Sequence, residues 1–365
     1  MSFIGFTYEI APEAQFEDRY QEMITLGIAK ADVDKLRATI TDMWADAPGG
    51  WAYEWSAVAA TYRKQGDLLK AALAYSFAKF PCAANQARLT AQENQIACYL
   101  EAAPGFPVKF ERRTVAIPFG DDSFDLPVHL FSASGQFEGG PVLLLSGGVD
   151  GFKIDVHGIC VELSQRLGMT VLAFDLAGTG EAPIPLTRKG GDAIIAALAK
   201  YARRIGNGKV GYMGISFGGN FAAMAGLSGI VDAAVVNGGP IEKSFTLENA
   251  KALPYGMRGI IGNDMHYTSE PSVEEYNDGW QQFNLRDLLD RTDNTAMLVI
   301  NGQNDYFVPL ADTLVFASRA RTDVHVLGDT GHCALLAGKP GGTARTSEVV
   351  DLVTAWLPGK LASAT

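Results

Sequence analysis

The chain has 365 residues, of which 47% are hydrophobic and 19% charged, a composition typical of a folded protein with one large and one smaller domain. Its formal net charge of −11 argues against a nucleic acid or an anionic membrane as partner. The first residues lack a basic stretch followed by an apolar core, and no apolar run approaches a membrane span, so we expect a cytoplasmic protein.

The first hundred residues are predicted to be helical. Apolar residues recur every three to four positions in residues 33–44 and 67–78, and no strand pattern interrupts them. The pattern changes between residues 103 and 107. We therefore expect a helical domain over residues 1–104 and a second domain over residues 105–365.

A group of aromatic residues surrounds a Pro-Gly-Gly turn in the helical domain: Trp44, Trp51, Tyr53, Trp55 and Tyr62. Most are expected to pack in the core of that domain. One or two, with Trp51 and Trp55 as candidates, are expected to line a pocket for a planar aromatic or polyketide-like substrate.

The second domain is predicted to begin with a hairpin and to continue as a parallel sheet. Residues 113–118 and 125–131 flank a loop typical of a hairpin. Six short apolar runs then alternate with helical stretches: 142–145, 170–174, 209–213, 233–236, 296–300 and 324–327. Such runs indicate an α/β fold with a mostly parallel sheet covered on both faces. The interval 238–295 is too long for one crossover and is predicted to hold a helical insertion.

The loop after the first apolar run, residues 146–152, is rich in glycine. It is interpreted either as the source of a backbone N–H that binds an oxyanion, from Gly148 or Val149, or as a flexible turn. Residues 175–181, after the next run, lack the Lys-Ser/Thr ending of a phosphate-binding loop and fit a turn after a strand.

Residues 214–218 read Gly-Ile-Ser-Phe-Gly and lie between an apolar run and a stretch of small residues typical of a helix. A serine on a strand-turn-helix element of this kind is held exposed in a strained backbone conformation. We interpret Ser216 as a nucleophile and the N–H of Phe217 as the first oxyanion donor, the alternative being a structural glycine turn.

A serine hydroxyl needs an imidazole to take its proton and a carboxylate to orient that imidazole. Asp305 follows the apolar run that ends at Ile300, and His332 follows the run that ends at Leu327. The order Ser216, Asp305, His332 predicts nucleophile, acid and base. Asp305 alone could equally be a turn residue or a helix cap.

Several other residues are weaker candidates. Glu242 is the alternative acid, and Glu242 or Glu248 could protonate a carbanion leaving group. His157 and His266 could contact substrate, whereas His129 and His325 lie inside apolar strands. The candidates for substrate binding are Trp51, Trp55, Tyr306, Glu242 and Glu248. Four scattered cysteines favour free thiols over disulfides, and no metal site is expected.

From residue 108 onward, the motifs at 146–151, 175–181, 214–218, 304–305 and 331–332 together resemble the α/β-hydrolase superfamily. With its helical N-terminal domain the chain is similar to the FrsA-like esterase group, which includes 2,6-dihydroxypseudooxynicotine hydrolases and fungal pigment-pathway polyketide-shortening hydrolases. The resemblance implies an α/β-hydrolase fold, an N-terminal all-helical cap domain and a homodimer. It also implies cleavage of esters or of carbon–carbon bonds in 1,3-diketones.

Three functions are compatible with these residues. The first is a serine hydrolase that needs no cofactor and acts on a small molecule through Ser216. The second is an acyltransferase or cyclase that uses the same triad and excludes water. The third is a binding or regulatory protein on the same fold.

Overall fold

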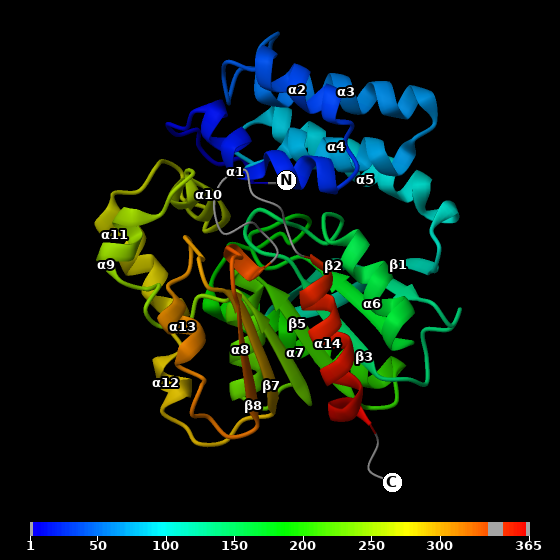
Figure 1. Cartoon of the computed structure of the whole chain (residues 1–365), viewed down its shortest axis with the longest axis vertical. Helices are drawn as coiled ribbons and strands as arrows, with labels where there is room; N and C mark the ends of the chain where they lie inside the picture. The colour runs from blue at the N-terminus through cyan, green and yellow to red at the C-terminus, as the bar shows by residue number, and fades with distance from the viewer. Residues whose placement is uncertain (1–2, 335–345, 363–365) are drawn as a thin grey trace. The chain divides into compact units, whose positions relative to one another are not determined.

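The computed structural model describes residues 3–334 and 346–362, and it divides the chain into two compact units (Figure 1). The first unit contains the chain up to Phe106 together with Leu253–Ser272. The second contains Pro107–Ala252 and the described residues from Val273 onward. Within the described ranges, no helix is both long and apolar enough to span a membrane.

The first unit is helical. Its elements are α1 (Pro12–Thr25), α2 (Lys30–Thr39), α3 (Trp51–Gln65), α4 (Leu68–Lys79), α5 (Gln86–Ala102), the 3-10 turn η1 (Ala103–Gly105) and α10 (Met257–Asp264). The helix predicted over residues 33–44 ends earlier than expected, because Ile40 is extended with ψ 123° and Asp42 forms an isolated β-bridge with Gly50. The apolar period there continues into a loop whose side chains are still partly buried.

Helix α10 belongs to the first unit because Asn263 binds the backbone near the N-terminus. The Phe6 N–H donates to Asn263 Oδ1 at 2.9 Å, and Asn263 Nδ2 donates to the Phe6 carbonyl at 3.1 Å and to the Gly259 carbonyl at 2.8 Å. The expected second domain of residues 105–365 therefore lacks residues 253–272 in the structure. Phe6 and Asn263 are 257 positions apart, and a hydrogen bond between such distant residues produces no periodic pattern in the sequence. The sequence therefore did not predict that α10 belongs to the first unit.

The second unit is built on one sheet of eight strands in the order β1-β2-β4-β3-β5-β6-β7-β8. The strands are β1 (Lys109–Phe119), β2 (Asp122–Ser132), β3 (Val142–Ser146), β4 (Thr170–Phe174), β5 (Val210–Ile215), β6 (Ala233–Asn237), β7 (Ala296–Gly302) and β8 (Thr322–Leu327). β1 and β2 form the predicted hairpin, β2 runs antiparallel to β4, and every later pair is parallel. The prediction of a mostly parallel α/β sheet is confirmed.

Helices cover both faces of this sheet. The helical elements described in the second unit are α6 (His157–Leu167), α7 (Arg188–Ile205), α8 (Phe217–Leu227), α9 (Leu247–Ala252), α11 (Val273–Trp280), η2 (Gln281–Phe283), α12 (Arg286–Leu289), α13 (Leu310–Leu314), η3 (His332–Ala334) and α14 (Thr346–Leu361). α14 packs against α6 and strands β5 to β7, whereas α7 packs against α8 and against β1, β3 and β5.

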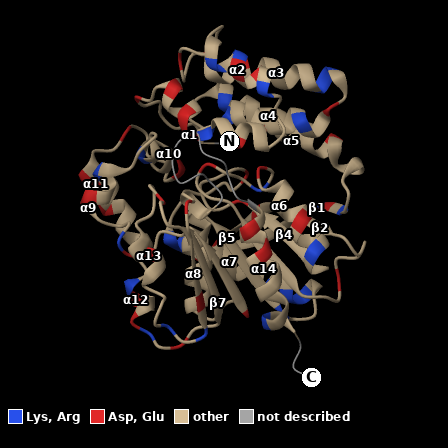
Figure 2. Cartoon of the chain, viewed as in Figure 1, with Lys and Arg blue, Asp and Glu red and all other residues tan. Residues whose placement is uncertain are grey.

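Two-sided coverage explains the apolar runs. Every residue of β3, β4, β5, β6 and β7 is buried, as a sheet with helices on both faces requires. In Figure 2 the central strands β5 and β7 have the colour of uncharged residues, and neither strand contains Lys, Arg, Asp or Glu. β8 is at the edge of the sheet and is only partly buried. The loops at the carboxyl ends of the parallel strands are therefore the place where polar side chains can converge.

Candidate active site

Ser216 lies between β5 and α8 in a backbone conformation that few residues adopt. Its φ is 57° and its ψ is −125°, and this strain is fixed by hydrogen bonds from the Ser216 N–H to the Asn237 carbonyl at 2.8 Å and from the Gly219 N–H to the Ser216 carbonyl at 2.8 Å. A Cβ added to Gly214 would lie 1.9 Å from the Gly218 carbonyl oxygen. The turn is therefore too tight for a side chain at that position.

His332 connects Ser216 to Asp305. Its Nε2 lies 2.8 Å from Ser216 Oγ, and its Nδ1 lies 2.8 Å from Asp305 Oδ2. A carboxylate can only accept, so Nδ1 carries the proton of the neutral imidazole, and in that form Nε2 is free to accept the serine hydroxyl proton. The structure brings together the three residues that the sequence predicted in this order.

The Asp305 carboxylate is held by three further hydrogen bonds. Asn301 Nδ2 donates to Oδ2 at 2.8 Å, and the N–H groups of Phe307 and Val308 donate to Oδ1 at 2.8 and 3.0 Å. Burial acts to raise the pKa of Asp305, but the neighbouring His332 and these donors hold the pKa below its ordinary value. Asp305 thus remains an anion next to the imidazole.

The same contact sets the charge of His332. Burial acts to lower the pKa of the imidazole, but the Asp305 carboxylate raises the pKa well above its ordinary value. The imidazolium that would form when His332 takes a proton from Ser216 is thereby stabilised.

The glycine-rich loop after β3 lies directly against Ser216. A Cβ added to Gly148 would come within 2.8 Å of Ser216 Cβ and 2.9 Å of Ser216 Oγ. Val149 is buried in the same loop. The Phe217 side chain stacks on Trp280 at 4.9 Å and contacts Phe283 edge-on at 5.0 Å between ring centroids, which fixes the first turn of α8.

Tyr306 and the two glutamate candidates have different surroundings. Tyr306 packs on Phe307 at 4.7 Å, and the Phe307 ring in turn meets the His332 ring edge-on at 5.0 Å. Glu242 forms ion pairs with Lys243 at 3.0 Å and Arg286 at 3.7 Å, so its carboxylate is not the partner of His332. Glu248 is exposed on the first turn of α9.

Trp51 and Trp55 lie in the core of the first unit and not on a pocket wall. Both are 0% exposed. Trp51 stacks near Phe16 at 4.9 Å and donates from Nε1 to the Phe77 carbonyl at 2.7 Å, and Trp55 packs on Phe77 at 4.9 Å. The expectation that these two indoles line a pocket is wrong, because the helical unit uses them as its own apolar centre.

The remaining histidines are dispersed. His157 is buried at the start of α6, where burial lowers its pKa to about 4, and His129 is buried in β2 with a pKa far below the ordinary value for the same reason. His266 stacks on Phe3 at 4.0 Å in the first unit. His325 lies on the edge strand β8.

Two residues that hold loops of this unit were not predicted from the sequence. Asn301 ends the apolar run of β7, and its Oδ1 accepts from the Gly302 and Cys333 N–H groups while its Nδ2 binds Asp305. Asp312 accepts from the N–H groups of Ile241, Glu242 and Ser244 at 2.9 to 3.0 Å and so fixes the loop after β6. A polar residue directly after a buried strand was the available signal for Asn301.

The comparisons with known proteins bear on the family and the fold of the chain. The family described as "Esterase FrsA-like" matches residues 17–327. Esterase FrsA of Photobacterium profundum is 24% identical over 285 residues, 71% of this chain and 66% of the relative, so the match spans just under two thirds of that relative's length.

Two solved structures share the fold. AbyA5 has a TM-score of 0.69 at 23% identity, covering 82% of this chain and 87% of its own. A structure described as the 2,6-dihydroxy-pseudo-oxynicotine hydrolase has a TM-score of 0.73 at 19% identity, covering 94% of this chain and 96% of its own. With the family match over most of its length, the chain belongs to the FrsA-like esterase family of α/β-hydrolases.

Proposed function

We propose that this protein is a serine hydrolase that cleaves a carboxylic ester of a small molecule, aromatic or polyketide-like, without a cofactor. The observation that carries the proposal is the continuous hydrogen-bond chain from Ser216 Oγ through His332 to Asp305, with 2.8 Å at each step. A serine on a strained turn has no structural need of such a chain. It is the arrangement that makes a hydroxyl nucleophilic near neutral pH.

The proposed reaction proceeds in two halves. Ser216 Oγ attacks the ester carbonyl carbon while His332 Nε2 takes the hydroxyl proton, and the tetrahedral oxyanion is bound by the N–H of Phe217 and that of Gly148 or Val149. The carbonyl re-forms, the C–O bond to the alcohol breaks, and His332 returns its proton to the leaving oxygen. Water then attacks the acyl-enzyme with the same proton transfers and releases the acid.

Ester cleavage fits the described contacts better than carbon–carbon cleavage of a 1,3-diketone. In the ester reaction His332 alone can protonate the alkoxide leaving group. The carboxylates expected to assist a carbanion leaving group are otherwise engaged, since Glu242 pairs with Lys243 and Arg286 and Glu248 is exposed. Mass spectrometry of the products from aryl esters and from 1,3-diketones distinguishes the two reactions.

Replacement of the nucleophile tests the proposal directly. In Ser216→Ala we expect kcat on p-nitrophenyl acetate and butyrate to fall by roughly 10³-fold or more and labelling by a fluorophosphonate to disappear. Ser228→Ala, at the other end of α8, is the matched control and should keep both. Full turnover in Ser216→Ala would contradict the proposed serine hydrolase function.

The alternatives give different results in the same assays. An acyltransferase or cyclase would pass the acyl group to an added alcohol or thiol in preference to water, whereas exclusive hydrolysis in its presence supports the esterase. A binding or regulatory protein would not be labelled by the fluorophosphonate. The homodimer, the cytoplasmic location and a capping role for the helical residues 1–104 remain predictions from the sequence and its resemblance.

A further inference from the structure

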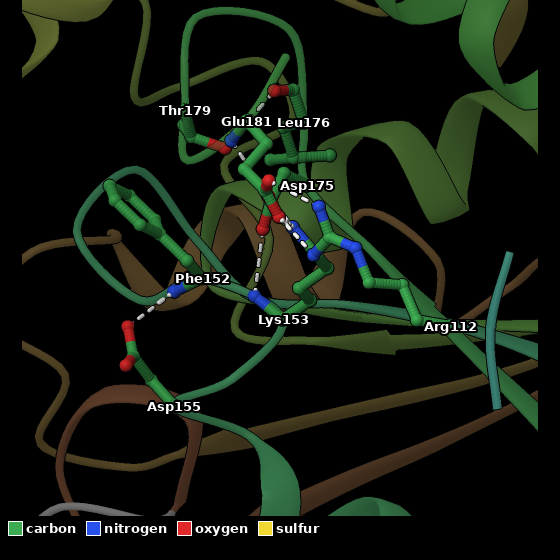
Figure 3. A network of polar contacts seen from close by, with 8 residues as sticks. All are labelled: Arg112, Phe152, Lys153, Asp155, Asp175, Leu176, Thr179 and Glu181. Carbon is green, nitrogen blue, oxygen red and sulfur yellow. Dashed lines mark hydrogen bonds and ion pairs between the residues drawn. The ribbon is translucent and has the colours of Figure 1, made fainter. Parts of the chain in front are cut away.

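A cluster of four charged side chains lies at the end of the glycine-rich loop, residues 146–152 (Figure 3). The Lys153 N–H donates to Asp175 Oδ1 at 2.8 Å, and Lys153 Nζ forms ion pairs with Asp175 and, at 2.7 Å, with Glu181 Oε2. The Arg112 guanidinium binds both oxygens of Glu181, at 2.7 and 2.8 Å. The cluster therefore ties this loop to the loop after β4 and to strand β1.

The cluster is buried and electrically balanced. The side chains of Lys153 and Asp175 are 2% and 1% exposed, and Glu181 and Arg112 are partly covered. Burial acts to raise the pKa of Glu181, but Arg112 and Lys153 lower it to about 2. Glu181 thus stays ionised near neutral pH, next to the Arg112 guanidinium. Buried ion pairs of this kind contribute little net stability compared with apolar residues of the same size. Their presence here therefore favours a role in holding the loop backbone in position.

Asp175 uses both of its oxygens to hold backbone. Oδ1 accepts from the Lys153 N–H, and Oδ2 accepts from the Glu181 N–H at 2.9 Å in addition to the Lys153 ammonium. At the adjacent residue, the Phe152 N–H donates to Asp155 Oδ2 at 2.7 Å. Both N–H groups at the end of the loop are therefore bound by carboxylates, which leaves this end little freedom to shift.

A buried tyrosine fixes the other end of the loop. Tyr212 Oη lies 2.8 Å from Ser146 Oγ and donates to the Gly218 carbonyl at 3.3 Å. Burial raises the pKa of Tyr212 well above its ordinary value, so the hydroxyl keeps its proton. Ser146 is two residues before Gly148, and Gly218 is one residue after Phe217. One hydroxyl thus bridges the two segments that carry the proposed oxyanion donors.

We propose that Arg112, Lys153, Asp175, Glu181 and Tyr212 are positioning residues that set the distance between the Gly148–Val149 amides and Ser216. The proposal rests on the serine hydrolase function, because an oxyanion forms only after Ser216 attacks a carbonyl. None of the five needs to touch the substrate. Their effect is on transition-state binding, where a small displacement of a donor is costly.

Arg112→Met is the main test, with Arg113→Met as its matched control. Arg113 is the next residue of β1, but its guanidinium pairs with Glu111 at 2.8 Å and Glu138 at 3.4 Å, outside the cluster. In Arg112→Met we expect kcat to fall roughly 10- to 100-fold with KM within about twofold. Arg112→Lys, which keeps the charge but not the two-pronged contact, should recover part of the loss, and Arg113→Met should match the wild type.

Two further readouts separate positioning from a general loss of structure. Phenylboronic acid forms a tetrahedral adduct on a reactive serine, so its Kd should weaken by the same factor as kcat. The midpoint of the acidic limb of the pH profile should stay in place, because the His332–Asp305 contact is untouched. All rates are taken per active site labelled by a fluorophosphonate. Glu181→Gln and Tyr212→Phe, which nearly preserve shape, give the same readouts if Arg112→Met folds poorly.

The outcomes distinguish this proposal from the function on which it rests. Turnover that depends on Ser216 but is unchanged per labelled site in Arg112→Met, Glu181→Gln and Tyr212→Phe would overturn the positioning role alone. So would a loss that appears only in KM and leaves boronate binding unaltered. Turnover that survives Ser216→Ala would overturn the hydrolase function instead.

Discussion

Asp305 determines the protonation behaviour of the site at the scale of single residues. Its carboxylate is fully buried and is the main influence that raises the pKa of His332 against the effect of burial. Only neutral His332 can take the proton of Ser216. With the proposed function, the activity is therefore expected to rise with pH as the imidazolium loses its proton, and the raised pKa moves this rise to higher pH than an ordinary histidine would give.

The variant Asp305→Asn tests the direction in which Asp305 shifts the pKa of His332. Without the carboxylate, burial dominates and the pKa of His332 falls, so the acidic limb of kcat/KM against pH should move to lower pH. We also expect kcat to fall by roughly 10³- to 10⁴-fold, because an amide does not hold the imidazole in the productive tautomer. Asp351→Asn, at an exposed pair with Arg166, is the control. An unchanged midpoint in Asp305→Asn would contradict the assigned role.

At the scale of elements, the site depends on two turns that approach each other more closely than side chains allow. The loop after β3 contacts the turn between β5 and α8 at Gly148, where an added Cβ would be 2.8 Å from Ser216 Cβ. Gly151, in the same loop, has nothing within 4 Å of an added Cβ. Gly148 therefore has no room for a side chain, whereas Gly151 does, although both lie in the same short loop.

Gly148→Ala and Gly151→Ala compare these constraints. The methyl group at residue 148 must push the loop or Ser216 aside, so we expect kcat to fall by about 100-fold, while Gly151→Ala retains activity. Urea unfolding midpoints of both variants should stay close to that of the wild type, because the change is confined to one loop. Equal activity in the two variants would argue against a close contact between the loop and Ser216.

Local patterns predicted the elements well and the contacts between distant elements poorly. The buried strands appear as apolar runs, and the loops after β5, β7 and β8 supply Ser216, Asp305 and His332 in the predicted order. Arg112 and Glu181 are 69 residues apart and belong to no motif, so their pairing depends on the strand order β1-β2-β4. Trp51 shows the same limit, since an aromatic residue has the same sequence signature in a core and in a pocket.

At the scale of the whole molecule, the described residues of the first unit come from two separate parts of the chain. Asn263, which is 3% exposed, forms two hydrogen bonds that join α10 to the segment around Phe6, and a third to the Gly259 carbonyl within α10. A Cβ on Gly259 would lie 2.5 Å from the Tyr8 ring, so the same segment also packs closely there. The helical unit is therefore complete only when residues 253–272 are present.

Asn263→Ala should destabilise this unit. Removal of the amide leaves the Phe6 N–H and carbonyl buried without these partners, at a cost of about 2–4 kcal/mol. Urea unfolding followed by tryptophan fluorescence measures the loss, since Trp44, Trp51 and Trp55 all lie in the first unit. Asn277→Ala, at a partly exposed position on α11, is the control. Identical unfolding curves for the two variants would contradict the joining role of Asn263.

The pairing of Phe6 with Asn263 also sets a delay during synthesis on the ribosome. The two residues are 257 positions apart, so at roughly 5–20 residues per second the second partner is made on the order of 10–50 s after the first. Once α5, which ends at Ala102, has been made, the nascent N-terminal helices lack their last helix until α10 (Met257–Asp264) follows. We therefore expect chaperones that bind partly folded nascent chains to bind the helices α1 to α5. This binding would occur before residues 305 and 332 have been synthesised.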